Sequence, residues 1–240
     1  MGLESGNDEG LKVLHKQITV EQNVEAVRIL KQIGLMFEFG FMMFDPSSTV
    51  ASIRDNLQFL KTIIGDGCAA AMFCRMLPYD GTPIKEDLER SGRLRGNVIA
   101  PDYDFVDPKV TELYRSFSKV VDVWGWVHGF RSLSPQLNWA WNEIAVMRHL
   151  FPSLAGLDGY IESIRGLTRR SNDVLFAVME DLLDVAVKGS FSSWTTAEFH
   201  AERERFFDEL LAARNGFVSR HQRVLMEAID ADLALTGAIT

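Results

Sequence analysis

The sequence predicts a fold in two parts, an α/β part over residues 1–107 and an all-helical domain over residues 108–240. In the first part, helical patterns alternate with short, fully apolar segments. The apolar segments begin about thirty residues apart, which is the repeat of right-handed βαβ units in a parallel sheet. After Gly96 the apolar segments stop and only helical periodicity remains, which predicts the second part.

The α/β part begins with a helical pattern from Asn7 to about Ile33, which Gly34 ends. The segment from Leu35 to Phe44 is short, apolar and aromatic, as a strand buried on both faces would be. The first strand of this repeat would end near Leu3, so the chain begins where a strand should be finishing. We therefore expect Met1 to mark a cut through a larger domain.

The next unit repeats this order. Asp45-Pro46-Ser47 separates the strand from a helix over about 48–64, and the sequence GDG ends that helix. A second strand is predicted from Cys68 to Leu77, and PYDGTP closes it with residues typical of turns.

The helical part contains two pairs, Asp107-Pro108 and Ser134-Pro135, that resemble helix starts with proline in the first turn. Long periodic stretches follow over 153–187 and 195–235. We expect four to six helices after Pro108 and no strands. Four tryptophans fall in the first two helices and are interpreted as packing residues; they are Trp124, Trp126, Trp139 and Trp141.

Composition narrows the range of partners. The chain has 240 residues, 47% of them hydrophobic, and a net charge of −8, so a basic surface for nucleic acid or an anionic membrane is not expected. No apolar run approaches the roughly 18 residues of a membrane span, and no signal-peptide pattern opens the chain. We expect a cytoplasmic protein with its two cysteines, Cys68 and Cys74, reduced.

Three segments carry a family resemblance: GLESGNDEG with the helix that follows it, FEFGFMMFDPSSTV, and MFCRMLPYDGTPI. In this order they resemble the fourth, fifth and sixth strands of a radical S-adenosylmethionine (SAM) enzyme barrel, in its cobalamin-associated branch. The resemblance covers about residues 2–107 and implies a partial parallel βα barrel. The complete enzyme would modify a small metabolite by radical methylation or rearrangement.

The resemblance also implies site residues at the carboxyl ends of the strands, where ligands of such barrels bind. Glu4 and Ser5 would contact the ribose or the amino acid part of SAM, and backbone around Phe41 and Phe73 would flank the adenine. An alternative for Glu4 and Ser5 is a helix N-terminal cap, since SGNDEG also suits one. Arg75 could hold a ligand carboxylate, or it could form an ion pair with Glu38 or Asp66.

The chain departs from the family in its cluster ligands. The family holds a [4Fe-4S] cluster on three cysteines in a C-x3-C-x2-C loop, and this sequence has no such loop. Cys68 and Cys74 are predicted to lie on one face of a single strand as packed thiols. The cluster and cobalamin would require sites supplied by a missing N-terminal part or a partner, and we expect no metal site here.

Two further functions stay open beside the enzyme fragment. The chain could be a non-catalytic binding or scaffold partner of a radical SAM enzyme, or a non-radical enzyme with a remodelled SAM-like pocket. An unpaired edge of a partial barrel would invite a protein partner or self-association. The roles of His128, His149 and His200 are undecided, because a lone histidine is usually structural.

Overall fold

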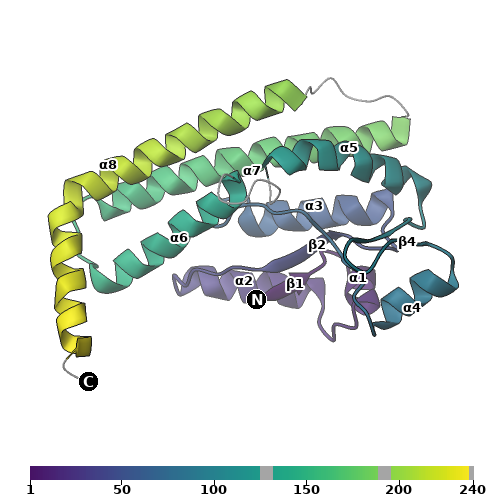
Figure 1. The fold of residues 1–240 in the computed structure, drawn as a ribbon, viewed down its shortest axis with the longest axis horizontal. Coiled ribbons are helices and arrows are strands. Elements are labelled where there is room, and N and C mark those ends of the chain that lie inside the picture. The colour runs from purple at the N-terminus through teal and green to yellow at the C-terminus, as the bar shows by residue number, and fades with distance from the viewer. Residues whose placement is uncertain (125–131, 189–195, 238–240) are drawn as a thin grey trace.

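The computed structural model describes the backbone of residues 1–124, 132–188 and 196–237. This part of the chain is mostly helical and holds a small parallel sheet (Figure 1). The strands are β1 (Gly2–Glu4), β2 (Gly40–Phe44), β3 (Cys74–Arg75), β4 (Leu94–Gly96) and β5 (Pro101–Tyr103). The helices are α1 (Asp8–Val13), α2 (Val20–Gln32), α3 (Val50–Ile64), α4 (Pro83–Arg90), α5 (Pro108–Trp124), α6 (Leu133–Leu150), α7 (Leu157–Lys188) and α8 (Thr196–Gly237).

The parallel sheet has the order β1-β2-β3, and both pairs of strands are parallel. The predicted adjacency of the segments 35–44 and 68–77 is therefore confirmed. A strand that ends near Leu3 is confirmed as well, since β1 pairs with β2. Among the described residues β1 and β3 form the two edges of this sheet, so a closed barrel is not seen.

The predicted single helix over 7–33 is wrong, because the chain turns between α1 and α2. His15 has a left-handed backbone with φ of 54°. Thr19 then starts α2 with a capping box, in which its hydroxyl accepts from the backbone N–H of Gln22 and the Gln22 side chain accepts from the backbone N–H of Thr19. The sequence TVEQ carries this start signal in the middle of the helical pattern.

The strand predicted from Cys68 to Leu77 is much shorter than expected. Two asparagine side chains from the helical part take the backbone groups that a longer strand would offer to β2. Asn138 accepts from the N–H of Ala70 (3.0 Å), and Asn172 accepts from the N–H of Ala71 (2.8 Å). Only Cys74 and Arg75 pair with β2.

The antiparallel hairpin β4–β5 was not predicted. Its turn is built by Asn97, whose side-chain oxygen accepts from the N–H groups of Ile99 and Ala100, and by Gly96 at φ of 75°. After Pro108 the structure describes four helices and no strand within 108–124, 132–188 and 196–237, in agreement with the prediction for that part. Asp107 accepts from the N–H of Lys109 at the start of α5, whereas the N-cap of α6 is Ser132 rather than Ser134.

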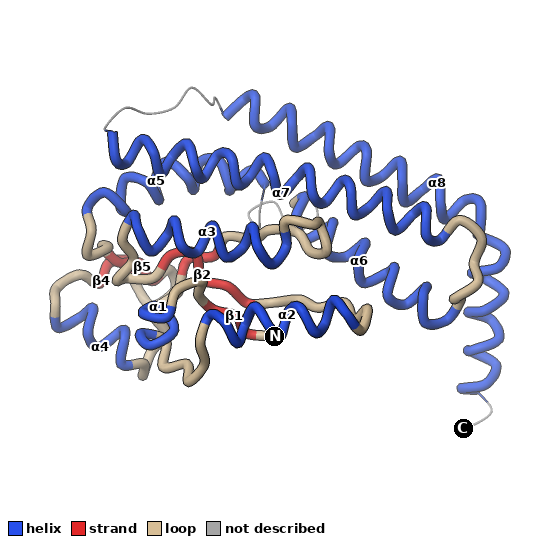
Figure 2. The backbone as a smooth tube through the Cα atoms, turned by 180° about the vertical axis from the view of Figure 1, so that it is seen from behind, coloured by secondary structure: helices blue, strands red, loops and turns tan. Residues whose placement is uncertain are grey.

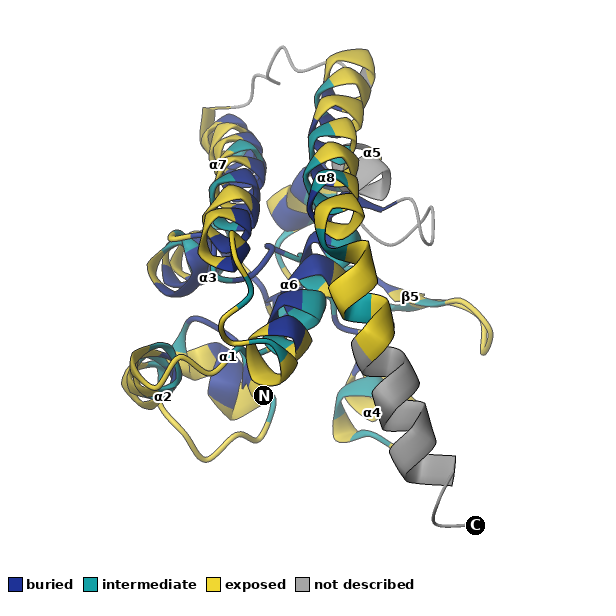
Figure 3. Ribbon diagram, turned by 90° about the vertical axis from the view of Figure 1, so that its left-hand side faces the viewer, coloured by how far each residue is buried: buried dark blue, intermediate teal, exposed yellow. Residues whose placement is uncertain are grey.

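The long helices pack on the sheet through α3, which lies between the strands and α7 (Figures 1 and 2). The buried faces of α7 and α8 point toward one another, and their outer faces are exposed (Figure 3). In the described part of the chain no helix has the length and apolar character needed to cross a membrane.

Candidate functional site

The loops that follow the carboxyl ends of β1, β2 and β3 lie together at one end of the sheet, which we call the carboxyl edge. The register pairs Glu4 with Phe41 and Phe44 with Arg75. Parallel strands place their carboxyl ends at a common edge, which is where ligands of open α/β sheets bind. This carboxyl edge, and not an outer strand of the sheet, is the candidate site.

Glu4 and Ser5 lie at the end of β1 in different environments. Glu4 has a left-handed backbone with φ of 64°, and its carboxylate pairs with Lys16 at 3.0 Å. Ser5 is buried, and its hydroxyl donates to the side-chain oxygen of Asn56 (3.1 Å). Asn7 is the N-cap of α1, with its side-chain oxygen accepting from the N–H of Gly10. The stretch therefore leads into a helix cap, but neither Glu4 nor Ser5 is the cap.

Phe41 and Phe73 pack against different helices. Phe41 is stacked on Phe59 of α3, with ring centroids 5.7 Å apart. Phe73 contacts Phe117 of α5 at 5.3 Å and Phe176 of α7 at 6.3 Å. A role of their backbone beside an adenine stays a prediction.

Arg75 lies inside an aromatic cluster. Its guanidinium carbon is 4.0 Å from the ring centroid of Tyr103, 4.6 Å from that of Tyr114 and 4.9 Å from that of Phe105. The guanidinium also pairs with Asp102 and donates to the carbonyl oxygen of Tyr103. An arginine over aromatic faces is stabilised by cation–π attraction, so the cluster holds hairpin β4–β5 against the end of β3.

The alternative of an ion pair between Arg75 and Glu38 or Asp66 is not seen, since Arg75 pairs with Asp102. Asp66 pairs with Lys31 at 2.8 Å, and Glu38 accepts from the side chain of Asn142. Asp102 lies in the hairpin, which the sequence pattern did not reveal.

Two polar atoms of the aromatic cluster have no hydrogen-bond partner among the described residues: Nε of Arg75 and the hydroxyl of Tyr103. Both atoms are buried, and burial raises the pKa of Tyr103 while the nearby Arg75 opposes that rise. The tyrosine therefore stays a neutral hydrogen-bond donor.

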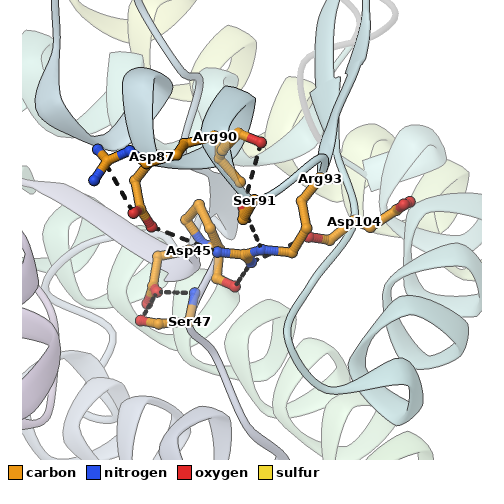
Figure 4. Close-up of polar contacts among 9 residues, drawn as sticks. Asp45, Ser47, Asp87, Arg90, Ser91, Arg93 and Asp104 are labelled. Carbon is orange, nitrogen blue, oxygen red and sulfur yellow. Dashed lines mark hydrogen bonds and ion pairs between the residues drawn. The ribbon is translucent and has the colours of Figure 1, made fainter.

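Asp45 and Arg93 lie at the turn that follows β2 (Figure 4). Asp45 is buried, and its carboxylate accepts from the N–H and hydroxyl of Ser47 and from the hydroxyl of Ser48. Arg93 donates to the carbonyl oxygens of Pro46 (2.9 Å) and Asp104 (3.3 Å). The Asp45 carboxylate is thus occupied by its own turn, and Arg93 fixes the hairpin over that turn.

Aromatic side chains also fill the face of β2 that carries Phe44. The Phe44 ring lies 5.2 Å from the ring of Tyr114, 5.6 Å from that of Phe117 and 6.2 Å from that of Phe105. The helical part and the segment after β5 therefore cover this face of the sheet from within the same chain.

The two cysteines do not share a strand face, because Cys68 lies before the short β3. Both are free and partly buried. Burial raises the pKa of Cys68 to about 12 and raises the pKa of Cys74, so neither thiol is poised as a thiolate ligand. Since the chain has only two cysteines, the three-cysteine donor set of a [4Fe-4S] loop does not fit its residues.

Other candidates are dispersed. His149 and His200 are exposed, and His128 lies outside the described residues. Trp141 is buried and donates to Thr168, while Trp139 is 57% exposed; Trp126 and the Trp124 side chain are not described. Within the described ranges no group of three or more His, Cys, Asp or Glu residues is placed to hold a metal ion.

Sequence interpretation missed Tyr103, Tyr114 and Arg93, which shape this edge. Strands of three residues are too short for a pattern of alternating polarity, and Tyr114 was hidden in an ordinary amphipathic helix. The pair Arg93 and Arg95 around an apolar Leu94 was the available signal.

Comparisons with known proteins give local and weak likenesses. No family model matches the chain. A curated protein, the 4′-phospho-dehydrooxetanocin synthase of Priestia megaterium, is 37% identical over 62 residues, which make up 25% of this chain and 8% of that protein.

Solved structures of the cobalamin-dependent S-adenosylmethionine radical enzyme OxsB are 16% identical to this chain. The form with aqua-cobalamin superposes with a TM-score of 0.46 and covers 87% of this chain and 41% of that one. The form with aqua-cobalamin and SAM has a TM-score of 0.45 and covers 100% and 38%. The chain thus spans less than half of these enzymes and a small part of the curated synthase.

Proposed function

We propose that this chain is a portion, or a cluster-free relative, of a cobalamin-type radical SAM enzyme, and that it contributes a SAM-binding edge at the carboxyl ends of β1–β3. The observation that carries the proposal is the position of Glu4: it ends a parallel strand inside the segment that resembles the family. The local similarity to the synthase supports it.

In this proposal residues 1–107 are part of a parallel βα barrel, and residues 108–240 are the helical domain that packs against it. The complete enzyme would act on a small metabolite in the cytoplasm, by radical methylation or rearrangement. A partner or a second copy would cover the open edge of β1, because an unpaired strand edge is a template for pairing.

In this proposal the chain binds SAM, and other parts of the enzyme bind the other cofactors. Glu4 is the residue suited to SAM, since a carboxylate accepts from ribose hydroxyls or an ammonium group. The [4Fe-4S] cluster and cobalamin would bind to residues supplied from elsewhere, because two weakly acidic thiols do not provide the cluster's ligands.

A second candidate function is a non-catalytic binding or scaffold partner of such an enzyme. The aromatic packing on Phe44 favours it, because Phe105, Tyr114 and Phe117 occupy the face of β2 that a barrel interior would leave for a ligand.

Isothermal titration calorimetry of the full chain with SAM separates the two functions. The proposal predicts binding that Glu4→Ala weakens about tenfold or more, as expected when a charged hydrogen-bond acceptor is lost. The matched control is Glu9→Ala, which removes an exposed carboxylate of α1 that pairs with Lys12. Equal affinity of Glu4→Ala and the unchanged chain would remove Glu4 from the site, and absence of SAM binding would favour the scaffold.

A further inference from the structure

A surface cavity of about 210 Å³ lies at the opposite end of the sheet from the candidate site. Its walls come from the segments that precede β2 and β3 and from α6. The residues that give it chemistry are Glu38, Phe39, Met72, Asn138, Trp139 and Asn142. It is independent of the proposed SAM edge, because that edge is formed by the carboxyl ends of the same strands.

The polar groups of this cavity are held in place by other residues. Asn142 donates to Oε1 of Glu38 (2.8 Å). Asn138 accepts from the N–H of Ala70 (3.0 Å) and its amide lies 3.7 Å from the Met72 sulfur. A site whose side chains are already oriented loses less entropy when a ligand binds.

Trp139 is held although it is exposed. Its indole N–H donates to Oε1 of Glu143 (2.9 Å), and Oε2 of Glu143 accepts from Nε of Arg214 in α8 (3.1 Å). A tryptophan that remains 57% exposed while its N–H is fixed presents a rigid aromatic surface at the cavity.

The negative charge of the residues that line the cavity favours a cationic ligand. Glu38 supplies a carboxylate, and none of the described residues that line the cavity is a lysine or arginine. The other lining residues are aromatic, aliphatic or thioether groups and the two asparagine amides. Carboxylate and aromatic groups together attract cations with an apolar body.

We propose that this cavity binds a small organic cation, an ammonium or guanidinium compound, with its charge on Glu38 and its apolar part against Trp139. The volume is below the roughly 300 Å³ at which pockets for drug-sized ligands begin. The ligand is therefore the size of a simple amine.

Three probes test the charge requirement: choline, methylguanidinium and propylammonium, with 3,3-dimethyl-1-butanol as the neutral analogue of choline. Binding to the full chain is followed by the indole N–H signals in ¹⁵N–¹H NMR spectra, and the Trp139 signal is assigned from its loss in Trp139→Phe. We expect at least one cation to shift the Trp139 signal with saturation and the neutral analogue to bind about tenfold more weakly or worse. Failure of all three cations, or equal binding of choline and its neutral analogue, overturns the proposal.

Variants locate the site. Glu38→Gln keeps an oxygen for Asn142 but removes the charge, so cation affinity falls about tenfold or more. Trp139→Leu removes the aromatic surface and weakens binding by a similar factor, whereas Trp139→Phe weakens it less, as measured by calorimetry. The matched control Asp184→Asn removes an exposed carboxylate of α7 that pairs with Arg54 and Lys188, and its affinity is unchanged. An equal loss in Asp184→Asn and Glu38→Gln would show that only net charge matters and would refute the site.

Discussion

One side-chain oxygen of Asn56 accepts hydrogen bonds from residues at the end of β1 and just after it. That oxygen accepts from the hydroxyl of Ser5 (3.1 Å), the N–H of Gly6 (2.7 Å) and the amide of Asn7 (3.3 Å), while its own amide donates to the carbonyl oxygen of Met43 (3.1 Å). The Ser5 hydroxyl is thus already used in a hydrogen bond that holds the fold together. The proposed ligand would contact Glu4 more readily than Ser5, because the partner of Glu4 is the half-exposed Lys16, which solvent can replace.

Gly6 allows this arrangement, and its replacement provides a prediction at the residue scale. A Cβ at position 6 would lie 2.5 Å from the Cβ of Phe59 and 2.9 Å from the Cα of Asn56. We expect Gly6→Ala to lower the free energy of unfolding by about 1–3 kcal/mol or more, the cost of overpacking a core.

Urea unfolding followed by circular dichroism measures this change. The control is Gly159→Ala in the first turn of α7, where an added Cβ meets nothing within 4 Å and helix propensity predicts a gain of up to about 1 kcal/mol. If both variants shift the midpoint in the same direction, the close approach at Gly6 is not what selects glycine.

The positions of these site residues in the fold could be predicted from the sequence, but their hydrogen-bond and ion-pair partners could not. Glu4 and Arg75 were placed at strand ends because strand ends follow from apolar segments and the turns after them. The partner of Arg75 could not be predicted, since Asp102 lies in a hairpin with strands too short to show a pattern. Asn56 was hidden because an asparagine inside a helical pattern gives no sign of which loops it will bind.

At the scale of elements, β3 shows why apolar composition overestimates strand length. The residues before Cys74 have the apolar character of a buried strand, yet their backbone is bound by side chains from other elements. Asn172 of α7 is fully buried, accepts from the N–H of Ala71 and donates to the carbonyl oxygens of Ile64 (3.1 Å) and Ala69 (2.9 Å). A buried backbone group needs a partner but does not require a neighbouring strand to supply it.

Asn172→Leu should therefore be strongly destabilising. The side chains are similar in size, but the substitution removes the hydrogen-bond partner of the Ala69 carbonyl oxygen and of the Ala71 N–H in the core. The carbonyl oxygen of Ile64 still accepts from the N–H of Gly67 (3.0 Å). Each unsatisfied group costs about 1–3 kcal/mol, so for these two groups we expect a loss of about 2 kcal/mol or more in urea unfolding.

The matched control is Asn215→Leu, an exposed asparagine of α8. Its effect should stay within about 0.5 kcal/mol. Hydrogen exchange adds a local measurement, since the amide of Ala71, whose acceptor is Asn172, should lose protection in Asn172→Leu. Retained protection of the Ala71 amide would mean that another acceptor replaces the asparagine and that α7 does not shape the segment before β3.

On the scale of the whole molecule, the helical part forms one core with the sheet. Periodicity predicted α3, α5, α7 and α8, because long amphipathic helices show their spacing clearly. It could not predict which face each helix would cover, and Phe117 and Phe176, which both contact Phe73, were indistinguishable from other apolar residues of their helices. Contacts between distant segments depend on packing complementarity, which a single sequence does not display.

This shared core makes stability sensitive to alkaline pH. Burial raises the pKa of Cys68 from 9.0 to about 12 and that of Tyr160 from 10.0 to about 12. Above the ordinary pKa the unfolded chain releases these protons while the folded chain keeps them, so the unfolded state binds fewer protons and stability falls as pH rises. The loss begins near pH 9 for Cys68 and near pH 10 for Tyr160, and each group contributes up to about 1.4 kcal/mol per pH unit until pH reaches about 12.

Urea unfolding at several pH values from about 8 to about 11 measures that slope. Tyr160→Phe keeps the ring that stacks on Phe217 and removes the ionisable hydroxyl, so its stability should fall less steeply above about pH 10 than that of the unchanged chain. Tyr79→Phe is the control, because it removes a tyrosine hydroxyl from a side chain that is 67% exposed. Cys68→Ser should flatten the curve from about pH 9 upward by the same reasoning. If the slopes of Tyr160→Phe and Tyr79→Phe are equal, Tyr160 is hydrated in the folded protein and the contact between α7 and α8 is looser than the stacked rings indicate.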